Sequence, residues 1–103
     1  MPASEALALH TLVIPTPDGI ASRILAKAAG GSVTLFAFDA AQELTEHTSP
    51  FDALVQVLDG HFILTVGGAA IEAPAGSIVL LPAGVPHAVE APVAGRMLLT
   101  MLK

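Results

Sequence analysis

The sequence contains no cysteine, no tyrosine and no tryptophan, and its four basic residues are outnumbered by nine acidic ones. The absence of cysteine excludes disulfide bonds and thiolate metal ligands. The basic residues are scattered along the chain, at Arg23, Lys27, Arg96 and Lys103. Because they cannot form a patch that follows a phosphate backbone, we expect no binding to nucleic acid.

The sequence also lacks a hydrophobic run long enough to cross a membrane. The longest uncharged stretch, residues 73–89, is interrupted by Pro74, Pro82 and Pro86. These prolines exclude a continuous membrane-spanning helix. The first ten residues have neither the basic segment nor the long apolar core of a signal peptide. We therefore expect no membrane segment and a cytoplasmic location.

Apolar residues, in contrast, are abundant for a chain of this size. They make up 53% of the 103 residues, and only 13% are charged, whereas charged residues are about 25% of a typical soluble domain. The length fits one domain over residues 1–103. Because a small globule cannot hide so much apolar material alone, we expect a homodimer that buries one face of a sheet.

Nine glycines and eight prolines divide the chain into segments too short for ordinary helices. Residues 21–29 favour a helix by propensity, but Gly30-Gly31 is typical of a hairpin turn and favours a strand there. The N-terminal residues 1–20 are expected to form an irregular arm with a short strand at Leu12–Ile14. The strands expected after the arm cover residues 21–29, 33–38, 44–47, 53–58, 61–66, 69–73, 77–81, 87–91 and 96–102. This spacing predicts an all-β sandwich or barrel over residues 21–103.

One segment carries a recognisable motif, with Gly76, Pro82, Gly84 and His87 in the pattern Gly-x(5)-Pro-x-Gly-x(2)-His. This pattern resembles the second conserved motif of small single-domain bacterial cupins, in the RmlC-like group with a conserved cupin 2 barrel. An asparagine usually closes that motif, and this chain has Ala91 in its place. The resemblance covers about residues 20–103 and implies a double-stranded β-helix, or jelly-roll, barrel.

The first cupin motif is only partly present, because His47 and Gly60 fall on its positions but other ligand positions hold Ser49 and Ala53. Strand alternation would place His47, Ser49 and Ala53 on one face. The resemblance implies that His47 and His87 are the candidate ligands of a divalent transition metal such as Fe, Ni, Cu, Mn or Zn. With Ser49 they form the expected ligand pocket.

Further metal ligands are scarce in the sequence. Glu43 has the right parity but lies at the far end of its strand, whereas Asp52 and Gln56 have the wrong parity unless a bulge turns them inward. Without a metal, the two imidazoles would form hydrogen bonds or recognise an anionic ligand.

Three functional hypotheses follow. The first is a cupin that binds a small molecule, or a divalent metal, inside the barrel near His47 and His87. The second is a metal-dependent enzyme of the dioxygenase or isomerase type that uses the same two histidines and an unrecognised third ligand. The third is a structural oligomer with no occupied pocket.

Overall fold

The structure, a computed structural model, describes residues 1–103 and contains nine β-strands preceded by one helical turn. The helical turn α1 spans Leu9–Leu12. The strands are β1 Ile20–Ala28, β2 Gly31–Phe38, β3 Gln42–His47, β4 Asp52–Asp59, β5 His61–Val66, β6 Ala69–Pro74, β7 Ile78–Leu81, β8 His87–Ala91 and β9 Gly95–Leu102. The prediction of an all-β protein is confirmed.

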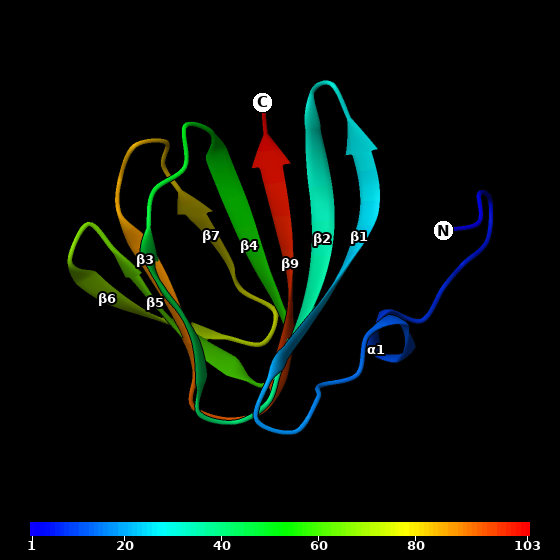
Figure 1. The fold of residues 1–103 in the computed structure, drawn as a ribbon, viewed down its shortest axis with the longest axis horizontal. Coiled ribbons are helices and arrows are strands. Elements are labelled where there is room, and N and C mark those ends of the chain that lie inside the picture. The colour runs from blue at the N-terminus through cyan, green and yellow to red at the C-terminus, as the bar shows by residue number, and fades with distance from the viewer.

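The strands form two sheets that pack face to face (Figure 1). The larger sheet has the order β1-β2-β9-β4-β7 and the smaller one the order β3-β8-β5-β6, with antiparallel pairing throughout. β9 is thus inserted between β2 and β4, and β8 between β3 and β5. These crossings from one sheet to the other produce the jelly-roll architecture that the sequence predicted.

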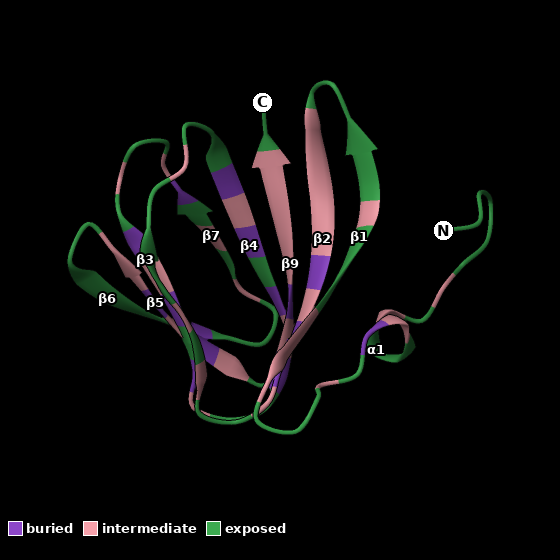
Figure 2. Cartoon of the chain, viewed as in Figure 1, coloured by how far each residue is buried: buried purple, intermediate pink, exposed green.

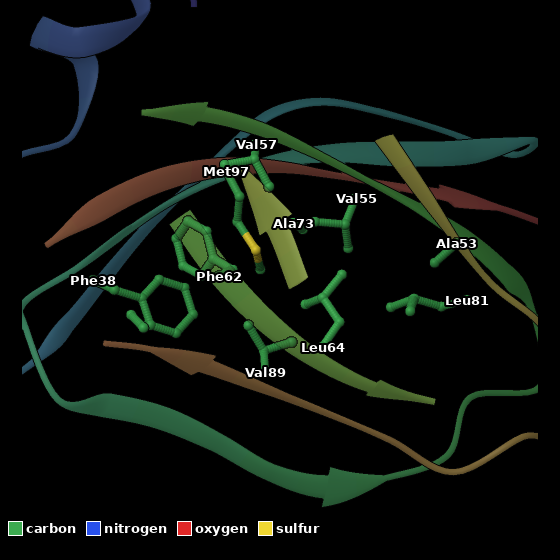
Figure 3. Close-up of a cluster of buried hydrophobic side chains, with 11 residues drawn as sticks. Phe38, Ala53, Val55, Val57, Phe62, Leu64, Ala73, Leu81, Val89 and Met97 are labelled. Carbon is green, nitrogen blue, oxygen red and sulfur yellow. The ribbon is translucent and has the colours of Figure 1, made fainter. Parts of the chain in front are cut away.

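The hydrophobic core lies between the two sheets, where alternate residues of each strand point inward (Figure 3). Phe38 from the larger sheet meets Phe62 from the smaller one edge to face, with ring centroids 5.1 Å apart, a favourable arrangement for aromatic pairs. The buried members of the core are Phe38, Ala53, Val55, Val57, Phe62, Leu64, Ala73, Leu81, Val89, Ala91 and Met97. Figure 2 shows the buried positions of β4 interrupted by more exposed ones, as a strand with one inward face requires.

The ambiguous segment after residue 20 is a strand, as the hairpin signal indicated. β1 pairs with β2 from Ile20↔Phe38 to Ala28↔Gly31, with a bulge between Ile24 and Ala26. The local helix propensity of this segment is overridden because its backbone groups join the edge of the larger sheet.

The expected strand at Leu12–Ile14 is absent, and this prediction was wrong. Leu12 closes α1, and the following Val13 is buried against Leu35 and Ala37 on the outer face of the larger sheet. The chain there has no strand partner, and apolar contacts across the sheet surface replace ladder hydrogen bonds. In Figure 1 this arm lies outside β1, away from the smaller sheet. The four-residue α1 is the single helix, and none in the structure has the length and apolar character needed to cross a membrane.

Candidate functional site

The two histidines of the predicted pocket are neighbours in the smaller sheet. His47 ends β3, His87 begins β8, and the two residues are register partners across these strands. Their Nε2 atoms lie 3.1 Å apart, and the ring planes are inclined at 70°. The structure therefore brings together two side chains that are 40 positions apart in the sequence.

The other nitrogen of each imidazole faces a backbone carbonyl. His47 Nδ1 is 2.8 Å from the carbonyl oxygen of Thr45, and His87 Nδ1 is 3.2 Å from that of Val85. Because a carbonyl oxygen only accepts hydrogen bonds, each Nδ1 must carry the hydrogen. In the neutral form of both rings, neither Nε2 atom carries a hydrogen, and two acceptor atoms lie 3.1 Å apart. This contact becomes favourable when a proton or a metal ion is shared between them.

The pair lies at the edge of a cavity of about 340 Å³ at the open end of the barrel. His87 is buried, with 6% of its surface exposed, whereas His47 is exposed toward the rim. The β3–β4 loop, the β7–β8 loop and the chain end after β9 come together at this end of the molecule, at the top of Figure 1. The lining residues are His47, Thr48, Ser49, Pro50, Phe51, Ala53, His87, Leu99, Met101 and Lys103.

Ser49 does not belong to the strand that carries His47. It lies in the loop between β3 and β4, because β3 ends at His47. Ser49 nevertheless lines the cavity, and its Oγ accepts a hydrogen bond from the backbone N–H of Phe51 at 3.1 Å. The hydroxyl hydrogen remains free to donate to a ligand.

Two hydrogen bonds connect the loops that carry the histidines. The backbone N–H of Gly84 donates to the carbonyl oxygen of Ser49 at 2.8 Å. The backbone N–H of Ala83 donates to Asp52 Oδ1, also at 2.8 Å. The β7–β8 loop that delivers His87 is therefore held against the segment that follows His47.

None of the three additional ligands considered from the sequence lines the cavity. Glu43 pairs with Glu90 at the other end of β3. Gln56 is exposed and pairs with Ile78 and Leu98, and Asp52 is engaged with Ala83. No group of three or more His, Cys, Asp or Glu side chains is placed to hold a metal ion.

The sequence interpretation missed Leu99 and Lys103 as lining residues. They lie on the same face of the chain as Met97 of β9, which is buried in the core. The sequence contained a signal for both residues. Every second residue of a strand faces the same side, so a core position at Met97 predicts that Leu99 and Lys103 face inward as well. Phe51, one of four phenylalanines in the chain, lies at the cavity mouth.

The donor atoms fit two neighbouring positions on a divalent transition metal. With metal–nitrogen bonds of about 2.1 Å, two cis imidazole nitrogens stand about 3.0–3.4 Å apart, and the observed separation is 3.1 Å. Metal-bound histidines also commonly donate their second ring hydrogen to a carbonyl, as the Nδ1 atoms do here. Small molecules or water would have to supply the remaining ligands.

A jelly roll of two antiparallel sheets with histidines from β3 and β8 at its open end defines a cupin-type barrel. The cupin domain profile matches residues 34–102. The chain belongs to the cupin domain family, as the motif around His87 indicated.

Solved structures show the same fold over almost the whole chain. A conserved protein of unknown function from Streptococcus pyogenes superposes with a TM-score of 0.94 and 33% identity, covering 100% of this chain and 90% of that one. A cupin superfamily protein from Desulfitobacterium hafniense gives a TM-score of 0.91 at 24% identity, over 99% and 94% of the two chains.

A cupin 2 conserved barrel domain protein from Leptotrichia buccalis has a TM-score of 0.84 and 35% identity over 88% of this chain. That match covers only 44% of the Leptotrichia chain. No functionally curated protein matches the sequence.

Proposed function

We propose that this cupin binds a small molecule in the open end of its barrel, at a site centred on His47, His87 and Ser49. The contact between the two Nε2 atoms is the observation that supports this proposal most directly. Two acceptor nitrogens 3.1 Å apart are well spaced to bind one cation together, and they adjoin a cavity of about 340 Å³. That volume is near the lower end of the roughly 300–1,000 Å³ typical of small-molecule sites.

A divalent transition metal is the proposed cation. His47 and His87 would hold it through Nε2, and imidazole ligands suit Fe, Ni, Cu or Zn, with Mn less favoured. Because the chain supplies only two neutral ligands, the bound ion would keep its positive charge and open coordination positions. It would supply Lewis acidity to a ligand in the cavity, while the Thr45 and Val85 carbonyls hold the two rings in orientation.

A metal-dependent enzyme of the oxidoreductase or isomerase type is the second candidate function. The open coordination positions favour it. In such an enzyme His47 and His87 would be metal ligands, and the lining contains no carboxylate to act as general acid or base in their place, which favours binding alone. The third hypothesis, a structural oligomer without an occupied pocket, is less well supported, since the cavity is open and has a polar side formed by His47, Ser49 and Lys103.

Metal analysis tests the proposal. Protein purified without chelator is incubated with Zn²⁺ or Ni²⁺, freed of excess ion, and its metal content per chain is determined. We expect about one ion per chain in the wild-type protein and a loss of at least tenfold in affinity in the double variant His47→Ala/His87→Ala.

The matched control is the double variant His10→Ala/His61→Ala, which removes two imidazoles that do not line the cavity. It should load metal as the wild-type protein does. Equal metal loading in both double variants would refute the proposed site, and so would a wild-type protein that takes up no metal and no small molecule.

A further inference from the structure

The cavity at the open end of the barrel is lined by one lysine and by no acidic side chain, although the protein as a whole is acidic. The chain has a formal net charge of −5, yet the titratable side chains that line the cavity are His47, His87 and Lys103, and no aspartate or glutamate is among them. A cavity whose lining differs in sign from the rest of the surface attracts ligands of the opposite charge.

Lys103 is placed at this cavity by its neighbours. Its backbone N–H donates to the carbonyl oxygen of Gly30 at 2.9 Å, which attaches the segment after β9 to the β1–β2 hairpin. Its Nζ lies 5.8 Å from the centroid of the Phe51 ring, within the range of a cation–π contact. Both residues line the same cavity.

The remaining lining has two chemical sides. The Ser49 hydroxyl is free to donate, because its oxygen accepts from the Phe51 N–H. The apolar part of the lining is formed by three side chains of β4 and β9, namely Ala53, Leu99 and Met101. Two donors beside an apolar wall suit a molecule with one anionic group and a short apolar body.

We infer that the ligand class of this site is a small organic carboxylate, which Lys103 and Ser49 bind through its anionic group. The inference rests on the proposed function and specifies its ligand. A carboxylate would also balance the charge of an ion held by two neutral imidazoles, because a two-histidine site contributes no negative charge of its own.

The test compares isosteric pairs of probes, acetate with acetamide and benzoate with benzamide, by NMR titration of the Ala53 and Met101 methyl groups. We expect each acid to bind about tenfold more tightly than its amide. Lys103→Gln should remove most of this difference. Lys27→Gln, which removes the same charge from β1, should leave it unchanged.

The outcomes separate this inference from the proposed function. Equal binding of acid and amide would overturn the carboxylate class and leave the pocket intact. Failure of all four probes in a protein that still binds metal through the two histidines would also overturn the inference alone. Failure of both the probes and the metal would refute the two proposals together.

Discussion

His47 and His87 approach each other through their Nε2 atoms at 3.1 Å, while the Nδ1 atom of each ring lies beside a backbone carbonyl. The contacts of the Nδ1 atoms determine the chemical state of the Nε2 atoms. Carbonyl partners fix the hydrogen on both Nδ1 atoms, so that both Nε2 atoms are acceptors. Two acceptors in contact repel one another slightly, and a cation bound by both atoms would relieve this repulsion.

The tautomeric state of the rings is the first prediction. At a pH where both imidazoles are neutral, ¹⁵N NMR should show His47 and His87 in the Nδ1–H form. Addition of Zn²⁺ should shift both Nε2 resonances and leave both Nδ1 hydrogens in place. His10, which lies outside the cavity, is the internal reference. Hydrogen on Nε2 of both neutral rings would contradict the arrangement.

A second prediction concerns Asp52, which we regard as a positioning residue. Its Oδ1 accepts from the Ala83 N–H in the loop that leads to His87. Asp52→Ala should lower the free energy of unfolding by about 1 kcal/mol, and it should weaken Zn²⁺ binding about tenfold because His87 is held less firmly. Calorimetric titration with Zn²⁺ and urea unfolding measure the two effects.

Two controls separate positioning by Asp52 from a general charge effect. Asp52→Asn keeps an acceptor oxygen for Ala83 and should retain most of the metal affinity. Glu46→Ala removes a negative charge from exposed β3 without touching this hydrogen bond. If all three variants bound Zn²⁺ as the wild-type protein does, the connection between the loops would have no role in the site.

The part of this site that could be predicted from the sequence is the part encoded locally. The spacing of Gly76, Pro82, Gly84 and His87 specifies a turn, a rigid loop and a strand start, and these lie where the motif indicated. Positions set by contacts between distant segments could not be derived in this way. The backbone of Ser49 is an example: the sequence assigned this residue to the pocket, but it reaches the cavity from the loop after β3, where the Gly84 N–H of another loop holds it.

The N-terminal arm shows the same limit at the level of the fold. Leu12–Ile14 has the composition of a strand, but it pairs with no strand of either sheet, and Val13 packs on the outer face of the larger sheet. Leu12 and Val13 are packed there without ladder hydrogen bonds, whereas the Ile14 side chain is exposed. The local sequence pattern therefore identified an apolar segment correctly, but it predicted a β-strand where the chain forms none.

A third prediction concerns Arg96, which holds this arm in place. Its Nε donates to the Val13 carbonyl oxygen at 2.9 Å, and its Nη1 lies 3.0 Å from Asp59 Oδ2. Arg96→Met keeps the apolar stem but removes both contacts, so hydrogen exchange over residues 1–14 should become faster. Global stability should fall by about 1 kcal/mol, because Arg96 is mostly buried and Asp59 partly exposed.

Arg23→Met is the control for Arg96, because it removes a guanidinium from exposed β1 that makes neither contact. Exchange in the arm should be unchanged in that variant. Equal acceleration of exchange in the two variants would mean that apolar packing of Val13, and not Arg96, retains the arm.

The last prediction uses three glycines to separate backbone strain from steric conflict. Gly60, in the β4–β5 hairpin, has φ +69°, and a Cβ there would lie 2.5 Å from the Ala94 carbonyl oxygen. Gly84 has a similar φ of +75° with nothing within 4 Å of an added Cβ, and Gly30 has neither constraint. Alanine should therefore be nearly neutral at Gly30. It should cost about 1–2 kcal/mol at Gly84 from left-handed backbone strain, and about 3 kcal/mol at Gly60, where displacement of the β8–β9 turn is added.

Urea unfolding of the three alanine variants measures this order through the transition midpoints. The difference between Gly60→Ala and Gly84→Ala isolates the steric contribution, since the two positions share the same sign and nearly the same value of φ. Equal losses at both positions would show that the β8–β9 turn gives way to the added methyl group. In that case the glycine of the Asp59-Gly60 turn would be required for its φ alone and not for the close approach of Ala94.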